Sequence, residues 1–195
     1  MVANDPGRLA IAGVGAEREP FAFVLPRKGI TALYGILDGR DGDVLVAQND
    51  SLLRFDVAGM ILTARKLARD FPDIDSVLDK VHPAAEFTAK TAALKIMLER
   101  MGDFSDDRSS HLRMTVEPGL LIMQRASSER GEGKAKLAID YTGEPVTIGI
   151  NRTFFLDAVR VVETEDVAIK FSDPGSPIMV ESNGYRSVIA PCQLK

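Results

Sequence analysis

A unit made of one strand, one helix and three further strands recurs along this chain, and its order restricts the folds that the chain can adopt. The clearest copy begins at residues 145–150, whose apolar pattern predicts a strand. Asn151 follows as a candidate helix cap, and Phe155, Ala158 and Val159 then fall at helical spacing on one face. The segments that follow predict three strands, joined by the turn sequences SDPGS and SNG, over residues 167–171, 177–181 and 185–191.

An earlier stretch repeats this order. Its leading strand is predicted at residues 21–25, and Pro26 is typical of a helix start. Both copies place a basic residue at the start of the helix, Arg27 and Arg152, and both open the next strand with an Asp-Val pair. The remaining elements of this copy are predicted from Ile30, Leu33 and Leu37 on one helical face and from strands over 43–48, 52–57 and 60–67.

A third copy lies between these two. A strand, a helix and an acidic loop are followed by three strands, and a flexible hairpin tip is expected at residues 129–133. The predicted elements of this copy are the strand 84–89, the helix 90–102 and the strands 111–117, 120–127 and 136–142.

Three such units predict an α+β fold with antiparallel sheets. Sheets of this kind carry helices on one face and leave the other face to solvent. One orphan strand, residues 7–14, precedes the first unit. The segment DKVHPAAE, with its proline and small residues, predicts a boundary that separates a partial domain, 1–83, from a complete two-unit domain, 84–195.

Composition excludes several classes of protein. The chain has 195 residues, 45% of them apolar, which suffices for a packed core. A net charge of −4 argues against a surface covered by nucleic acid, although a local basic strip stays open. The single cysteine, Cys192, excludes an internal disulfide framework. No apolar run approaches the roughly 18 residues of a membrane span, and the N-terminus does not resemble a signal peptide, so a cytoplasmic protein is expected.

Five segments in order resemble a known family. They are LPRKGITALYGILDG, FPDIDSVL, IGINRTFFLDAVR, VAIKFSDPGSPIMV and VIAPCQL. Together they are similar to the bacterial DNA polymerase III beta subunit, the sliding clamp, over nearly the whole chain. The resemblance implies the DNA-clamp fold, in which helices line a central hole around double-stranded DNA and sheets form the outer wall of a ring.

The chain departs from that family in length. The usual subunit has three domains, whereas Met1 corresponds to a position late in the middle domain, so the first domain and the first half of the middle domain are expected to be missing. The usual head-to-tail dimer could not then form. A homo-oligomer of two or four chains is favoured, with a partner clamp or a state without a ring as alternatives. Whether the shortness is natural, an internal start or a cloned fragment stays open.

The resemblance also implies a cleft for linear peptides where the middle and last domains meet. The family's Gly-His-Arg-Leu is Pro6-Gly7-Arg8-Leu9 here, and its bulky methionines near the C-terminus are replaced by small residues, which predicts a shallower or altered pocket. Packing between domains is the alternative role for the same positions. The residues implied for the cleft are Asn4, Gly7, Arg8, Leu9, Pro72, Val77, Val188, Ala190, Pro191, Cys192 and Gln193.

Basic residues on or beside the three helices are candidates for DNA contact. Contacts to phosphates are independent of base sequence and sensitive to salt, as sliding requires. Leu156 lies between the two arginines of its helix, so the charges do not form one clean face, and a solvated surface is the alternative. The candidates are Arg27, Lys28, Lys90, Lys95, Arg152 and Arg160.

The function implied is that of a clamp-like factor in DNA replication or repair, which is not an enzyme. It would tether DNA polymerase subunits and other proteins with clamp-binding motifs, with the help of an ATP-driven clamp loader. A truncated clamp that regulates or competes with the full-length clamp is one alternative. An interaction module that has lost DNA binding is another.

No motif indicates catalysis, a cofactor or a metal. His82 and His111 have no partner at metal-ligand spacing, and Cys192 has no histidine nearby in the sequence. GVGAER lacks the third glycine of a dinucleotide loop and GEGK lacks the spacing of a phosphate-binding loop, so both predict turns. The acidic residues Asp103, Asp106 and Asp107 predict a solvated loop rather than a cation site.

Overall fold

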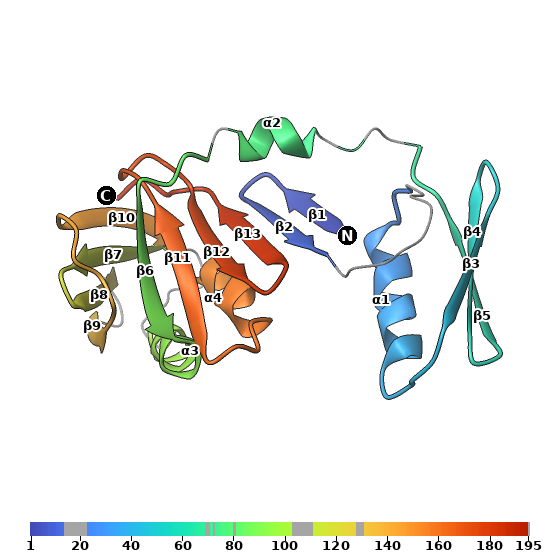
Figure 1. Cartoon of the computed structure of the whole chain (residues 1–195), viewed down its shortest axis with the longest axis horizontal. Coiled ribbons are helices and arrows are strands. Elements are labelled where there is room, and N and C mark those ends of the chain that lie inside the picture. Colours follow the sequence, from blue (N-terminus) through green and yellow to red (C-terminus); the bar gives the residue numbers. More distant parts are fainter. Residues whose placement is uncertain are drawn as a thin grey trace. The chain divides into compact units, whose positions relative to one another are not determined.

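The computed structural model describes residues 1–13, 23–68, 71, 73–79, 81–102, 111–127 and 131–194. These residues fall into two compact units (Figure 1). Unit 1 contains Met1–Gly15 and Asp75–Lys195, and unit 2 contains Ala16–Ile74. This division groups the leading residues with the C-terminal part of the chain, so the domain limits 1–83 and 84–195 stay a prediction.

Unit 1 contains two antiparallel sheets. The larger has six strands in the order β1-β2-β13-β12-β11-β6, and the smaller has four in the order β10-β7-β8-β9. The strands of the larger sheet are β1 (Val2–Asp5), β2 (Arg8–Ala12), β6 (Ala85–Lys90), β11 (Asp166–Phe171), β12 (Ile178–Ser182) and β13 (Tyr185–Ile189). The strands of the smaller sheet are β7 (His111–Glu117), β8 (Leu120–Ser127), β9 (Gly131–Ala138) and β10 (Val146–Asn151).

The two C-terminal repeats exchange their leading strands. Strand β6 leads into helix α3 (Thr91–Arg100), yet it pairs with β11 of the following repeat, with Lys90 opposite Asp166. Strand β10 leads into helix α4 (Arg152–Arg160), yet it pairs with β7 of the preceding repeat, with Asn151 opposite His111. In both pairs the last residue before a helix lies opposite the first residue of the other repeat's next strand. Neither repeat completes its sheet alone.

Helices α3 and α4 pack against each other and against the two sheets. At helix α4 the side chain of Asn151 accepts hydrogen bonds from the backbone N–H groups of Thr153 and Phe154, as expected from the sequence. The buried face of α3 includes Leu94 and Leu98. The matching face of α4 includes Phe155, Leu156, Ala158 and Val159. Both faces join one apolar core with residues from both sheets, such as Phe87, Met114, Ile148, Ile169 and Val180.

Unit 2 holds one helix, α1 (Arg27–Leu37), and a three-stranded antiparallel sheet. The sheet runs β3-β4-β5, and its strands are β3 (Val44–Gln48), β4 (Leu52–Val57) and β5 (Met60–Arg65). Helix α1 has no buried residue, whereas Leu53, Phe55 and Val57 of β4 are buried. The ring of Phe23 meets Phe55 edge to face, with 6.0 Å between centroids. The described residues of this unit therefore bury only a small apolar core.

Some predicted elements differ from those in the structure. Residues 23–25 lie outside any strand, and residues 21 and 22 are outside the described residues. The orphan strand proves to be the second arm of a hairpin, because the polar segment before it forms β1. Strand β9 begins at Gly131, inside the segment expected to be a hairpin tip. Helix α2 (Ile74–Leu78) was not expected. The α+β class and the antiparallel pairing are confirmed.

The cap of helix α4 can be tested by mutation. Replacing Asn151 by alanine leaves two backbone N–H groups without their acceptor, and the expected loss in the free energy of unfolding is about 1 kcal/mol. Urea denaturation of the two variants Asn151→Ala and Asn151→Ser measures it. The serine variant keeps a capping oxygen and is expected to lose much less, and an equal loss in both variants would contradict the role of the cap.

Candidate functional site

The N-terminal hairpin and the C-terminal strand of unit 1 form one continuous surface. Strand β2 pairs with β13, and Leu9 lies directly opposite Val188. Beyond the end of β13, the N–H of Ala190 donates to the carbonyl oxygen of Gly7 at 3.0 Å. Residues separated by most of the chain are thus held together by backbone hydrogen bonds.

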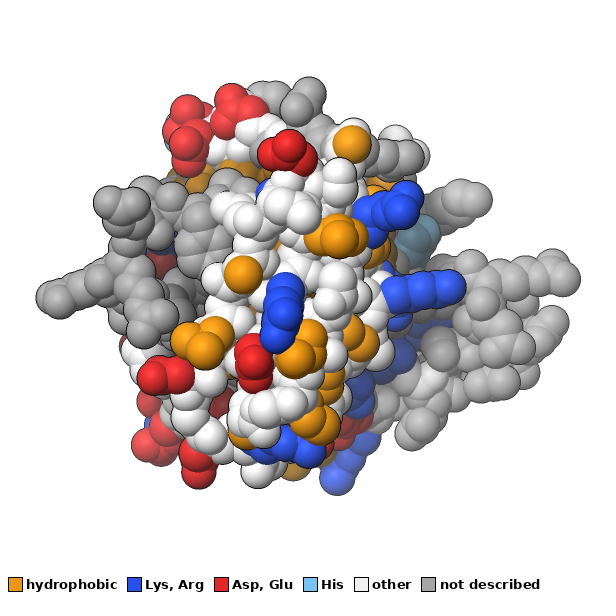
Figure 2. Space-filling model, turned by 90° about the vertical axis from the view of Figure 1, so that its right-hand side faces the viewer, with side chains coloured by type: hydrophobic (Ala, Val, Ile, Leu, Met, Phe, Trp, Pro, Cys, Tyr) orange, Lys and Arg blue, Asp and Glu red, His pale blue; other side chains and the backbone are white. Residues whose placement is uncertain are grey.

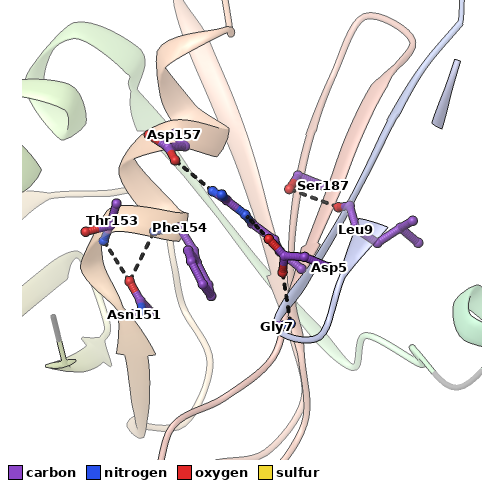
Figure 3. Close-up of polar contacts among 9 residues, drawn as sticks. Asp5, Gly7, Leu9, Asn151, Thr153, Phe154, Asp157 and Ser187 are labelled. Atoms are coloured by element: carbon purple, nitrogen blue, oxygen red, sulfur yellow. Dashed lines mark hydrogen bonds and ion pairs between the residues drawn. The ribbon is translucent and has the colours of Figure 1, made fainter. Parts of the chain in front are cut away.

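Arg8 fixes the hairpin to helix α4 (Figure 3). Its Nε donates to Asp5 at 2.9 Å, and its terminal nitrogen donates to Asp157 at 2.7 Å. Its guanidinium carbon also lies 4.4 Å from the centroid of the Phe154 ring. Two ion pairs and a cation–π contact therefore occupy this side chain, which leaves it little freedom to contact a ligand.

The turn of the hairpin requires a residue without a side chain. A Cβ atom built on Gly7 would lie 2.6 Å from Cε2 of Phe154, so any larger residue would have to displace the ring. Asp5 closes the same turn by accepting a hydrogen bond from the N–H of Gly7 at 3.0 Å. Because the Phe154 ring lies against Gly7 and also under the guanidinium of Arg8, a larger residue at position 7 would disturb the contact between Arg8 and the ring.

The charges of this network perturb one another. Burial alone would raise the pKa of Asp5, but the hydrogen bonds from Arg8 and from the N–H of Gly7 outweigh it and lower the pKa. Burial likewise opposes the charged form of Arg8, yet the carboxylates of Asp157 and Asp5 raise the pKa of its guanidinium. The lowered pKa of Asp5 and the raised pKa of Arg8 both favour the charged forms of these two groups.

A pocket of about 350 Å³ opens beside this network. It lies between the hairpin, helix α4 and strand β13, on the face of the sheet that carries Arg8, Ala10 and Ser187. Its lining is mostly apolar, with Asp5, Arg8 and Asp157 as its charged groups. Among the apolar and weakly polar residues of its lining are Ala10, Phe154, Ala158, Val161 and Tyr185.

Leu9 and Val188 lie on the opposite face of the sheet, since successive side chains of a strand alternate. They are 3% and 5% exposed, and neither belongs to the main core cluster of unit 1. Val77 is half-buried on helix α2. Asn4 is exposed on strand β1. Pro72, which the family resemblance implies for the same cleft, is outside the described residues.

The C-terminal tail is tied to strand β10. The N–H of Cys192 donates to the carbonyl oxygen of Gly149 at 2.8 Å. Pro191 and Cys192 are half-buried, whereas Ala190 and Gln193 are exposed. Burial raises the pKa of the Cys192 thiol, which lowers its thiolate fraction and slows its reactions near neutral pH.

Backbone pairing therefore joins Gly7, Arg8 and Leu9 to Val188 and Ala190. The sequence analysis did not predict the residues that hold Arg8 and the C-terminal tail in place. They are Asp5, Gly149, Phe154 and Asp157. The ion pair of Arg8 spans 149 positions of sequence, so no local pattern could have predicted it.

Two of the basic candidates for DNA contact tie α3 and α4 together. Nζ of Lys95 on α3 donates to the carbonyl oxygen of Val162, just beyond the end of α4, at 2.8 Å. Arg152 at the start of α4 donates to the carbonyl oxygen of Leu98, in the last turn of α3, at 3.1 Å. Each side chain satisfies a carbonyl near the C-terminal end of the other helix, which has no partner within its own helix.

The other basic candidates are exposed. Lys90 pairs with Glu165 and Asp166, and Arg160 pairs with Glu99 at 3.0 Å. Arg27 and Lys28 of helix α1 have no ion pair within the described part of the chain. Surface pairs of this kind contribute little and exchange readily with other anions.

The described residues hold no group of three His, Cys, Asp or Glu side chains that could bind a metal. His82 and His111 are exposed. The acidic residues Asp103, Asp106 and Asp107 are outside the described residues. Within the described part of the chain, no helix combines the length and the apolar character needed to cross a membrane.

Comparison with known proteins finds a family model that matches more than half of the chain. Residues 81–191 match the model of the DNA polymerase III beta subunit, C-terminal domain. The chain is 28% identical over 198 residues to the beta sliding clamp of Escherichia coli K12, an alignment that covers 99% of this chain and 54% of that protein. The chain thus spans about half the length of the curated relatives it matches.

Solved structures show the same likeness. A DNA polymerase sliding clamp from Pseudomonas aeruginosa, crystallised with a ligand, superposes with a TM-score of 0.92 and 26% identity over 99% of this chain and 54% of that one. A sliding clamp of the same organism bound to griselimycin superposes with a TM-score of 0.91, 26% identity and the same coverage.

The tie between the tail and β10 yields a prediction. A Cβ atom on Gly149 would lie within 2.2 Å of the carbonyl oxygen of Cys192, so Gly149→Ala is expected to release the tail. Release lowers the raised pKa of the Cys192 thiol, which increases its thiolate fraction at pH 8 and speeds its reaction with a thiol reagent. Stopped-flow labelling measures the rate.

The matched control is Gly35→Ala, because a Cβ atom at that position meets nothing within 4 Å. This variant is expected to react at the wild-type rate. An unchanged rate in Gly149→Ala would show that the tail is not held at this glycine.

Proposed function

The chain belongs to the DNA polymerase III beta subunit family, the bacterial sliding clamps, and we propose that it is a clamp-like replication or repair factor that tethers protein partners to double-stranded DNA. The observation that carries the proposal is the two-repeat domain over β6 to β13, whose two helices pack side by side against exchanged sheets. Tethering is a matter of shape and charge, so the proposed role needs no catalytic group.

DNA contact is proposed to be electrostatic and independent of sequence. Arg27 and Lys28 are exposed and free of ion pairs in the described part of the chain, which suits them to phosphate binding. Lys90 and Arg160 are exposed and can exchange their carboxylate partners for phosphates. Lys95 and Arg152 contribute chiefly by holding the two helices together, since both donate to backbone carbonyls.

Partner binding is proposed at the surface that contains Leu9 and Val188. This apolar pair is held by β2 and β13, and the tail from Ala190 to Gln193 follows β13 directly. The tail and Val77 are proposed to line the same cleft. A linear motif from a DNA polymerase subunit or another clamp-binding protein would place apolar anchors there. Small residues in the tail, Ala190 and Cys192, favour a shallow cleft.

The proposal has three further parts. A ring or a partial ring is expected to need an ATP-driven loader to reach closed DNA. The chain is expected to associate with itself, because unit 2 exposes much apolar surface. Its site of action is expected to be the cytoplasm.

One observation favours a second candidate function. Four of the six basic residues expected to contact DNA already have partners within the protein, namely Lys90, Lys95, Arg152 and Arg160. Because most of these charges already bind groups of the protein, the chain also fits an interaction module that does not bind DNA. It fits equally a regulator that competes with a full-length clamp for peptides without holding DNA. The two candidates differ in whether DNA is retained.

Retention on circular DNA separates them. The chain, loaded with a clamp loader and ATP on nicked circular DNA, is expected to stay bound and to be lost when the DNA is linearised. Arg27→Ala and Lys28→Ala should each reduce the slope of log K against log salt by about 1, and exposed Arg65→Ala on β5 should not. No retention on circular DNA, or equal retention on both forms, would contradict a tethering ring.

The peptide cleft is tested by substitutions at its apolar pair. Leu9→Asp and Val188→Asp place a charge without a partner in an apolar site, so both should abolish binding of a fluorescent clamp-binding peptide measured by anisotropy. Leu9→Ala is the milder variant. Leu121→Ala removes the same volume from the buried part of the four-stranded sheet and should keep its affinity. Unchanged affinity in both aspartate variants would exclude this placement of the cleft.

A further inference from the structure

Unit 2 has apolar surface that nothing in its own described residues covers. Leu53, Phe55 and Val57 are the buried residues among its described positions. Figure 2, which faces the end of the view where β3, β4 and β5 are labelled, shows apolar side chains scattered over the surface. A three-stranded sheet under one helix with so small a core is marginal by itself. The large apolar residues exposed in this unit are Ile30, Tyr34, Leu45, Val46, Leu52, Met60, Ile61, Leu67 and Phe71.

Unit 1 shows how such a unit is completed. In its β6 strand, Thr88 lies two residues before Lys90, the last residue ahead of helix α3. The backbone of Thr88 bonds Asp140 of its own repeat on one side and pairs with Ala168 of the other repeat on the other side. The leading strand is therefore shared between two repeats.

Unit 2 repeats one half of this arrangement. Val24 lies two residues before Pro26, the last residue ahead of helix α1, so it holds the place of Thr88. Its carbonyl oxygen accepts a hydrogen bond from the N–H of Leu67 at 3.0 Å, as Thr88 bonds within its own repeat. Across residues 23–68, no strand takes the place of β11 on the other side of Val24.

The helices show the same gap. Counted from the first residue of each helix, Ile30 of α1 holds the place of Leu94 in α3 and of Phe155 in α4. Ile30 is 44% exposed, whereas both counterparts are fully buried. Tyr34, four residues on, is 72% exposed, and its counterparts Leu98 and Val159 are fully buried. In unit 1 these positions belong to the shared apolar core of the two repeats.

Strand β3 has a free edge of the kind that β11 offers to β6. The Asp43-Val44 pair that opens it corresponds to Asp166-Val167 of β11, so Val46 holds the place of Ile169. Val46 is 38% exposed, whereas Ile169 is fully buried and lies opposite Phe87 of β6. The aromatic residue that corresponds to Phe87 is Phe23.

We infer that unit 2 is completed by unit 2 of a second copy of this chain. Residues 23–25 of each copy extend β3 of the other, and the two α1 helices pack through Ile30 and Tyr34. The register follows from Thr88 opposite Ala168, and it places Val24 opposite Leu45 of the second copy. This interface deepens the self-association proposed above and rests on it.

A second copy is the occupant that the chain itself supports. Among the described residues of unit 2, the leading segment pairs with no receiving strand and the outer edge of β3 pairs with no leading strand, so both halves of the exchange are present. Two copies related by a two-fold axis satisfy both at once, as an isologous interface does.

Solution mass and two charge substitutions test the interface. Sedimentation of the chain is expected to give about twice the monomer mass of 21.2 kDa. Tyr34→Asp buries an unpaired charge between the helices, so the dissociation constant should rise roughly 100-fold or more. Ile61→Asp alters a residue 54% exposed on β5 and should leave it unchanged. Loss of the dimer with Ile61→Asp and not with Tyr34→Asp would overturn the inference.

Disulfide trapping tests the register in a Cys192→Ser background. Mixing a Val24→Cys chain with a Leu45→Cys chain is expected to give a cross-linked dimer on mild oxidation, because opposed residues of paired strands come within disulfide reach. Val24→Cys mixed with Val46→Cys, which faces the other side of the sheet, should not cross-link. A dimer mass without the first cross-link would keep self-association and overturn this interface. A monomer mass at high concentration would overturn both, whatever the outcome of the DNA and peptide assays.

Discussion

The rest of the structure depends on the backbone hydrogen bonds between the leading strand of one repeat and the first strand after the helix of another. The β6–β11 and β10–β7 pairs close both sheets of unit 1 and bring α3 and α4 together. Only then can Leu94, Phe155 and Ile169 share one core. Unit 2 has a helix and three later strands, but its leading residues 23–25 lie outside any strand and its helix α1 has no buried residue.

The basic residues on or beside α3 and α4 form two kinds of contact, hydrogen bonds to backbone carbonyls and exposed ion pairs. Lys95 and Arg152 each donate to a carbonyl near the C-terminal end of the other helix, and a hydrogen bond from a charged group contributes about 2 kcal/mol in a partly buried setting. Moving either side chain to a phosphate would forfeit that bond. Lys90 and Arg160 hold only exposed ion pairs, which solvent screens. Binding to DNA should therefore draw on the exposed charges.

Sequence periodicity predicted the elements whose side chains alternate between core and solvent. Strands β4 and β7 have the predicted limits, and Asn151 caps α4 as expected. Periodicity failed where the backbone alone maintains a strand, as in the polar β1 and in β9, which begins with glycines and lysines and is held by its pairing with β8. It also could not foresee that Arg8 reaches Asp157, nor that Cys192 rests on Gly149, because only the folded topology brings these residues together.

The hairpin turn concentrates the departures from the family's motif. The ring of Phe154 lies against Gly7, where a Cβ atom would be, and Arg8 stacks on this ring while it forms ion pairs with Asp5 and Asp157. The guanidinium of Arg8 therefore forms its ion pairs on the face of the sheet that carries helix α4. The face with Leu9 is left to apolar contact, and Arg8 acts on it indirectly, because the same short strand carries both side chains. A change in the ion pairs of Arg8 that moves strand β2 would therefore also move Leu9 relative to Val188.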